Sequence, residues 1–205
     1  FVGDNGSDAP LGPVHEHASS FPLRAKKGTH YEGGMRVPFI ASWAKPSATN
    51  KVQERLPIPA GSIQKQLGTV TDIYPTILSV IGIKPPSHHA LDGTDLTKQI
   101  EGNQDTGRVE QFLMHFPHKH RSSYFTSFRD GDWKIIYHYR PNDNPAKTQY
   151  ELFNLVTDPY ENENLAERKP KVLKRMMESL VTSLKTESAL YPVDGNGNEM
   201  HPEVP

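Results

Sequence analysis

Two short stretches near the start of the chain gather residues that can do chemistry. The first, Asp4-Asn5-Gly6, places a carboxylate and an amide oxygen side by side. Hard cations such as Ca²⁺ and Mg²⁺ take oxygen ligands of this kind, and Gly6 lets the chain turn sharply behind them. An ordinary Asp-Asn-Gly turn has the same sequence, so the tripeptide by itself leaves both interpretations open.

The second stretch, residues 22–38, combines cations with glycines. Lys26-Lys27-Gly28-Thr29 puts positive charge beside flexible backbone, and Gly33-Gly34 lets another segment approach closely. This combination is suited to holding an oxyanion. The alternative is a glycine-rich surface loop with solvated lysines.

Composition narrows the classes of function. The 205 residues contain 23 Lys and Arg against 24 Asp and Glu, which excludes an electrostatic potential of one sign over the whole surface. We therefore expect no nucleic-acid partner. Cysteine is absent, which rules out disulfides, thiolate zinc sites and a cysteine nucleophile. No apolar run approaches the ~20 residues of a membrane-spanning helix, so we expect no membrane span.

The first half of the chain must position these residues. Residues 37–43 predict a buried strand, and the polar, proline-containing residues 46–66 predict a surface excursion. Residues 69–83 have the apolar periodicity of a helix, with Thr71 as N-cap and Gly82 as its end. We expect its apolar face to be buried by packing against other residues. A shorter helical pattern follows in residues 91–103.

The second half changes in character. Residues 122–128, 133–139 and 150–155 predict strands of an antiparallel meander. A helix is predicted to begin at Pro170 and to cover one face of that sheet. Its apolar stripe consists of Val172, Leu173, Met176, Leu180 and Leu184. The residues after 191 show no periodicity and predict a wrapped or frayed tail.

Taken together, these motifs resemble the sulfatases of the alkaline-phosphatase-like superfamily. The resemblance rests on D-N-G followed by P-L-R-x-x-K-G-T-x-Y-E-G-G-x-R-V-P, and on the TDIYPTILSVIGI, LDGTDL, GDWKIIYHY and YELFNLVTDPYENENLA segments. It covers most of residues 1–184. It implies an α/β fold in which residues 1–107 form the distal part of the sulfatase core. Residues 108–205 would form a small C-terminal α+β subdomain, an antiparallel sheet with a packed helix.

The resemblance also implies roles for individual residues. Asp4 and Asn5 match two ligands of the family's divalent cation, most often Ca²⁺, and Lys27 matches the catalytic lysine that contacts the sulfate. Three further residues match structural supports of the site: Thr29, Glu32 and Arg36. The substrate would be a sulfated carbohydrate or an aryl sulfate.

The family's nucleophile is a formylglycine made from a C/S-x-P-x-R signature that lies upstream of D-N-G. Ser20-Phe21-Pro22-Leu23-Arg24 matches that signature literally, but the L-T-G segment that should follow is absent, so we interpret the match as coincidence. We expect this chain to be the C-terminal part of a sulfatase, inactive without an upstream N-terminal sulfatase region. The full protein would be exported, as in the bacterial periplasm, or lysosomal.

The remaining chemistry-bearing residues are less specific. The segment from His115 to Arg121 holds three imidazoles, which give a weak zinc signal. We favour contact of His115 and His118 with a sulfated sugar over a solvated loop. Trp133, Tyr137 and Tyr139 are suited to stacking on sugars, but their alternation favours packing in the sheet.

Two other functions compete with sulfate ester hydrolysis. One is a phosphatase or phosphodiesterase of the same superfamily, because phosphate is held by similar groups. The other is a non-catalytic module that binds sulfated glycans.

Overall fold

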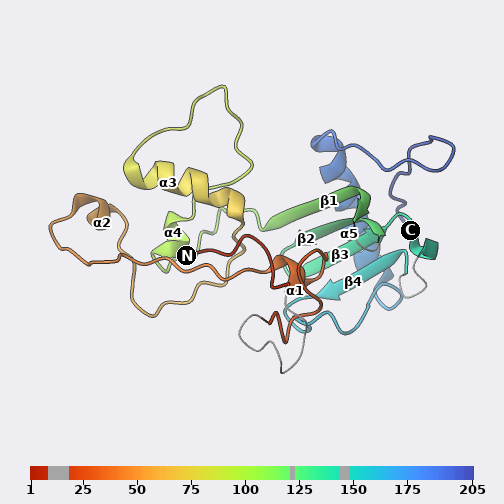
Figure 1. Ribbon diagram of the computed structural model, residues 1–205, viewed down its shortest axis with the longest axis horizontal. Helices are drawn as coiled ribbons and strands as arrows, with labels where there is room; N and C mark the ends of the chain where they lie inside the picture. The colour runs from red at the N-terminus through yellow and green to blue at the C-terminus, as the bar shows by residue number, and fades with distance from the viewer. Residues whose placement is uncertain (9–18, 121–122, 144–147) are drawn as a thin grey trace. The chain divides into compact units, whose positions relative to one another are not determined.

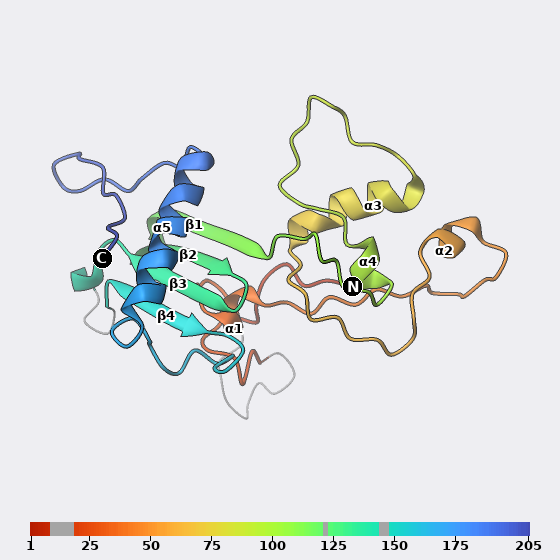
Figure 2. The same ribbon diagram turned by 180° about the vertical axis from the view of Figure 1, so that it is seen from behind.

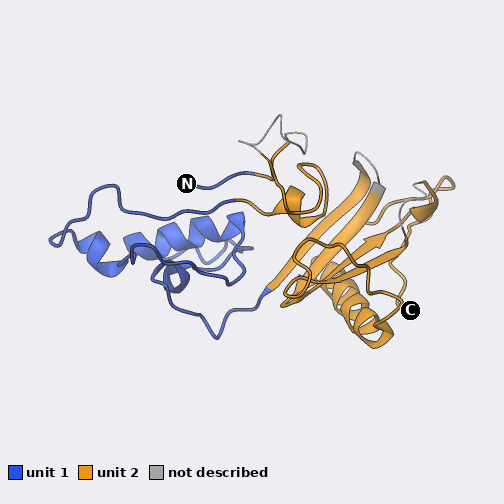
Figure 3. Ribbon diagram, turned by 90° about the horizontal axis from the view of Figure 1, so that it is seen from below, with its two compact units in different colours: residues 1–4, 38–110 blue, residues 5–37, 111–205 orange. Residues whose placement is uncertain are grey.

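The computed structural model describes residues 1–8, 19–120, 123–143 and 148–205. The chain divides into two compact units (Figure 3). The first holds residues 1–4 and 38–110, and the second holds residues 5–37 and 111–205. The domain boundary predicted between residues 107 and 108 stays a prediction. In the structure, residues 5–37 belong to the unit that contains the C-terminal sheet.

The first unit is built from short helices joined by long loops. They are α2 (Lys51–Arg55), the 3₁₀ turn η2 (Val70–Asp72), α3 (Ile73–Ile81) and α4 (Thr97–Ile100). The Asp72 carboxylate ties this unit together, because it accepts the backbone N–H groups of Thr69 and Thr94 and pairs with Arg108 at 2.6 Å. Among the described residues, no helix of either unit is long and apolar enough to cross a bilayer.

The helix predicted in residues 69–83 is confirmed as η2 and α3. It ends at Gly82 in the left-handed conformation, with φ 75°, as expected for a glycine stop. The predicted N-cap Thr71 is wrong, because helical backbone begins at Val70 with Thr69 as the N-cap. The expected packing of the apolar face is also wrong for this chain, since Tyr74, Ile77 and Ile81 are exposed.

The buried strand predicted in residues 37–43 is wrong as well. Phe39 makes a single antiparallel bridge with Val2, and the hydrogen bonds beside it join Gly3 to Pro38 and Phe1 to Ile40. Phe39 is 48% exposed and Ile40 60%. In the described residues no further strand continues this pair.

The second unit is centred on a four-stranded antiparallel sheet in the order β1-β2-β3-β4. Its strands are β1 (Gln111–His120), β2 (Ser123–Asp130), β3 (Trp133–His138) and β4 (Tyr150–Asn154), and the 3₁₀ turn η3 (Pro141–Asp143) follows β3. The three predicted strands and the meander are confirmed. Strand β1 was missed, because its run of histidines and Pro117 suggested a loop.

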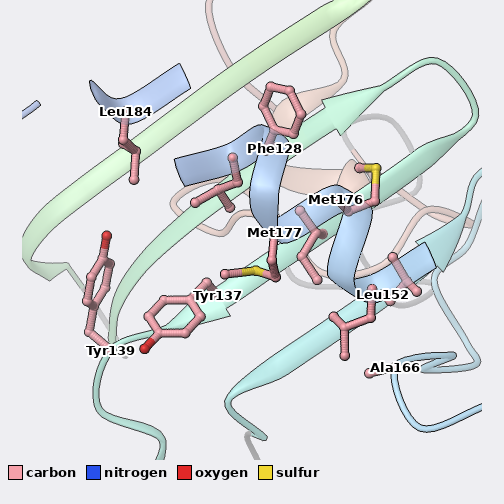
Figure 4. Close-up of a cluster of buried hydrophobic side chains, with 11 residues drawn as sticks. Phe128, Tyr137, Tyr139, Leu152, Ala166, Met176, Met177 and Leu184 are labelled. Carbon is pink, nitrogen blue, oxygen red and sulfur yellow. The ribbon is translucent and has the colours of Figure 1, made fainter. Parts of the chain in front are cut away.

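Helix α5 (Pro170–Thr186) covers one face of the sheet, as predicted (Figure 2). Leu173, Met176, Met177, Leu180 and Leu184 are buried against side chains that alternate along the strands. Figure 4 shows this core, to which the strands contribute Phe128, Ile135, Tyr137 and Leu152, and the residue directly after β3 contributes Tyr139. The tail wraps back on this core, with Tyr191 and Met200 packed against it.

The opposite face of the sheet carries the segment that contains the sequence motif around Lys27. Helix α1 (Glu32–Met35) and the residues before it lie on this face, with the sheet between them and α5 (Figures 1 and 2). The apolar cluster here is small and consists of Tyr31, Phe125, Ile136 and Phe153. Most of the other side chains buried on this face are polar.

Candidate functional site

The candidate site is the lysine loop, which we define as residues 24–36. Glycines let its backbone fold tightly on itself. A Cβ on Gly33 would lie 2.5 Å from the carbonyl oxygens of Arg24 and Ala25, and one on Gly34 would lie 2.5 Å from that of Thr29. A Cβ on Gly6 would lie 2.2 Å from the carbonyl oxygen of Gly33. The close approach predicted from Gly33-Gly34 is therefore confirmed.

Backbone hydrogen bonds hold the segment after Asn5 against this loop. The Gly6 N–H donates to the Gly34 carbonyl at 3.0 Å, and the Lys27 N–H donates to the Ser7 carbonyl at 2.9 Å. The Thr29 hydroxyl donates to the Lys26 carbonyl at 2.7 Å, closing the turn around Lys27. The Lys27 backbone is thus fixed on both sides. Its side chain is half-buried.

The three side chains that follow Thr29 anchor the loop to the sheet, and all of them are buried. His30 packs its ring against Phe125, with centroids 4.1 Å apart. The Tyr31 hydroxyl donates to the Glu151 carboxylate, with its oxygen 2.7 Å from Oε2. His138 Nε2 lies 2.9 Å from the same Oε2. Strands β3 and β4 therefore hold the loop through a shared carboxylate.

Glu32 reaches a second polar cluster on the same face. Lys134 of β3 is fully buried between two carboxylates, with Nζ 2.9 Å from Glu32 Oε1 and 2.7 Å from Glu161 Oε1. The Glu161 oxygen makes an ion pair there without the geometry of a regular hydrogen bond. Glu161 Oε2 accepts the Glu32 backbone N–H at 2.7 Å. Arg36 lies beside Glu32, with Nε 3.8 Å from Oε2.

Arg24 joins the two polar clusters. Its guanidinium donates to the Glu161 carbonyl at 2.8 Å and lies 3.6 Å from Glu151 Oε1. It also sits 3.9 Å from the centre of the Tyr31 ring, where a cation is attracted to the aromatic face. One arginine thus contacts the loop, β4 and the turn after β4.

Burial shifts the pKa values of two of these groups. Desolvation raises the pKa of Glu161 above its ordinary value of 4.5, although Lys134 opposes the shift. Burial, together with the neighbouring Glu151 carboxylate, also raises the pKa of the Tyr31 hydroxyl far above its usual range. Tyr31 therefore remains a hydrogen-bond donor throughout the neutral pH range.

Comparison with known proteins identifies this arrangement. Residues 25–188 match the family model described as N-sulphoglucosamine sulphohydrolase, C-terminal. The chain belongs to this family. The match includes most of the lysine loop, the whole sheet and α5, so the motifs that meet in the buried clusters are parts of one sulfatase C-terminal portion.

Curated relatives and solved structures agree with this assignment. N-acetylgalactosamine-6-sulfatase of Canis lupus familiaris is 39% identical over 108 residues, covering 53% of this chain and 18% of the relative. A sulfatase of Formosa agariphila is 30% identical over 184 residues, and the match covers 83% of this chain and 29% of the relative. The chain thus spans less than a third of the length of these relatives.

The crystal structure of Ps i-CgsB in complex with k-i-k-neocarrahexaose has a TM-score of 0.64 at 24% identity. The match covers 96% of this chain and 38% of that one. A likeness at this identity shows the fold. The α/β fold expected from the sulfatase resemblance is confirmed.

The structure places the residues that the sulfatase resemblance singled out in different settings. Asn5, Lys27, Thr29, Glu32 and Arg36 all belong to the second unit. Asp4 is exposed and belongs to the first unit. The roles assigned to these residues stay predictions.

The Ser20 hydroxyl donates to the Ala25 carbonyl at 2.6 Å, within a turn. The interpretation of S-x-P-x-R as coincidence stays a prediction.

His115 and His118 lie in β1 rather than in the predicted loop. Both ring nitrogens of His115 have partners, the Thr126 hydroxyl at 2.7 Å and the Leu190 carbonyl at 2.6 Å. His118 is exposed beside Phe116. Contact with a sugar stays a prediction for both. The rings of Tyr137 and Tyr139 pack in the α5 core, as the alternation favoured.

Sequence reasoning missed the residues that anchor the loop: Lys134, His138, Glu151, Glu161 and Arg24. A signal for two of them was present. Lys134, Ile136 and His138 alternate with Trp133, Ile135 and Tyr137 along β3, so both polar residues lie on the face opposite α5. A lysine and a histidine on one face of a central strand indicate a buried polar partner.

Proposed function

We propose that this chain is the C-terminal part of a metal-dependent sulfatase that hydrolyses sulfate esters of a sulfated carbohydrate. The family match to residues 25–188 carries the proposal, because it includes the lysine loop together with the sheet that anchors it. Relatives named N-acetylgalactosamine-6-sulfatase support a sugar substrate. Alone, the chain is expected to be inactive, since the nucleophile would come from an upstream N-terminal region.

Lys27 is the residue that acts on the sulfate in this proposal. A sulfate ester is a tetrahedral oxyanion, and a fixed cation stabilises the negative charge that develops as the ester bond breaks. The anchoring of His30, Tyr31 and Glu32 to the sheet limits movement of the loop that carries Lys27. Thr29 closes the turn beside it, and Glu32 with Arg36 supports the loop from the sheet side.

Asp4 and Asn5 would be two of the ligands of the divalent cation. The donor set fits, because a carboxylate oxygen and an amide oxygen suit Ca²⁺, and both residues retain accessible surface. When bound, the cation would supply Lewis-acid polarisation of the sulfate oxygens. A formylglycine from the upstream region would complete the site, in a protein exported from the cytoplasm or delivered to lysosomes.

The test uses the longer natural protein, identified by the intact mass of the native polypeptide that contains this chain. Lys27→Ala in that protein should reduce kcat/KM for a 6-sulfated amino sugar by roughly 10²–10³-fold, the cost of removing one charge-stabilising group. Lys26→Ala is the matched control, because its ammonium lies 3.7 Å from Asp8 in an exposed pair and has no proposed role. Equal effects of the two substitutions would contradict the assignment of Lys27.

A further inference from the structure

A compact group of metal-ligating side chains lies under the lysine loop. In the part of the chain that the structure describes, His30, His138 and Glu151 each offer one ligand atom. These atoms lie within 4.8 Å of one another, and all three residues are buried. None of them is among the residues that the sulfatase resemblance assigns to its divalent cation.

We propose that His30, His138 and Glu151 form a structural site for a divalent transition-metal ion, Zn²⁺, that fastens the lysine loop to strands β3 and β4. Two imidazoles and one carboxylate bind Zn²⁺ in sites where a water molecule takes the fourth position of the tetrahedron. With metal–ligand bonds of about 2.0–2.1 Å in a tetrahedral arrangement, ligand atoms stand about 3.3 Å apart. His138 Nε2 and Glu151 Oε2 are 2.9 Å apart, so this pair needs only a small separation, and the ligand nitrogen of His30 lies within 4.8 Å of the ligand atoms of both residues.

The surroundings of the three side chains resemble the outer shell of a metal site. The Tyr31 hydroxyl donates to the Glu151 carboxylate and would orient it as a ligand. The aromatic rings of Phe125 and Tyr31 pack around His30, with centroids 4.1 and 4.5 Å from its ring. Such an apolar shell excludes solvent and favours a fixed coordination geometry.

Among the three ligands, only the Glu151 carboxylate carries a negative charge, so a bound divalent ion would keep a net positive charge. The Arg24 guanidinium lies 3.6 Å from Glu151 Oε1 and adds to that positive charge. Arg24 is 37% exposed, so solvent screens part of its repulsion. The ion would link residue 30 of the loop to β3 and β4, three residues from Lys27.

The experiment measures zinc retained by the full 205-residue chain after saturation with Zn²⁺ and exhaustive dialysis. The wild type should retain about one Zn²⁺ per chain, whose X-ray absorption spectrum shows two imidazoles and oxygen at about 2.0 Å. The chain has ten histidines, so His88→Ala with His89→Ala, both exposed, serves as the matched control and should retain the ion. Substitution of Zn²⁺ by Co²⁺ should give the visible absorption of a tetrahedral ion.

His30→Phe is the test variant, because it keeps an aromatic ring against Phe125 while removing the ligand nitrogen. After dialysis it should retain at least tenfold less Zn²⁺ than the wild type. If His30→Phe fails to fold, the absorption spectrum of the wild type decides alone. A wild-type chain that retains no zinc, zinc bound through one imidazole or none, or a folded His30→Phe chain that retains it equally would overturn the proposal and leave a hydrogen-bonded cluster that holds no ion.

Discussion

Replacing Lys134 tests the physical account of how the sheet holds the lysine loop. Its ammonium lies 2.9 Å from Glu32 and 2.7 Å from Glu161, and all three side chains are buried. At an effective dielectric constant of 20, each attraction amounts to about 6 kcal/mol before desolvation is counted. Desolvation offsets much of this, and removing one partner from a buried ion pair typically costs about 3–5 kcal/mol.

Lys134→Met keeps the length of the side chain but leaves the buried Glu161 carboxylate without its lysine partner and Glu32 with only the more exposed Arg36, whose Nε lies 3.8 Å from Oε2. We expect the free energy of unfolding to fall by about 4 kcal/mol, most of it from the uncompensated charges. With an m-value of about 2 kcal/mol/M in urea, the midpoint should move down by about 2 M. Unfolding is followed by far-UV circular dichroism and by tryptophan fluorescence.

Two further variants separate charge from packing. Lys174→Met, on the exposed side of α5, should change the stability by less than about 0.5 kcal/mol. Adding Glu32→Gln and Glu161→Gln to Lys134→Met removes the stranded charges and should recover at least half of the loss. A loss below about 1 kcal/mol for Lys134→Met, or no recovery in the triple variant, would refute the reasoning.

Two other predictions concern the same face of the sheet. Because burial raises the folded-state pKa of Glu161 above 4.5, its proton stabilises the fold fully below about pH 4.5, and this contribution is lost as pH rises through the folded value. The stability of the wild type relative to Glu161→Gln should therefore fall between pH 4 and pH 7 in urea titrations, and a constant or rising difference would contradict this. Gly34→Ala would bring a Cβ to 2.5 Å from the Thr29 carbonyl oxygen and should cost about 1–3 kcal/mol, measured by thermal unfolding. Gly195→Ala, which meets nothing within 4 Å, is its control and should stay within about 0.5 kcal/mol, and equal losses would refute the steric argument.

Local sequence patterns predicted the helices and strands that have a clear hydrophobic period and recognisable end signals. Helix α5 has a first-turn proline and a continuous apolar stripe. In strands β2 to β4, successive side chains alternate between the two faces of the sheet, and turn residues separate the strands. Strand β1 was missed because Pro117 and its polar residues carry no strand period. It pairs with β2 through backbone hydrogen bonds, and the polarity of its side chains does not predict this pairing.

The site was predicted only in part, for a physical reason. Lys27, Glu32 and the paired glycines stand in one motif, so their resemblance to the sulfatase pattern located the loop. Their partners Lys134 and Glu161 lie more than 100 residues away along the chain, and no local period indicates which carboxylate a buried lysine will meet. The apolar stripe of α3 shows the opposite error, since amphipathic spacing predicts a covered face but does not name what covers it.

Sulfate ester hydrolysis is the central claim, and it is tested most directly by turnover of matched aryl sulfate and aryl phosphate by the longer natural protein. The account predicts release of sulfate with a higher kcat/KM than release of phosphate, and loss of turnover when divalent cations are chelated. Faster hydrolysis of the phosphate would assign the protein to a phosphatase or phosphodiesterase. Binding of sulfated glycans with no turnover of either ester would contradict the account and indicate a non-catalytic module.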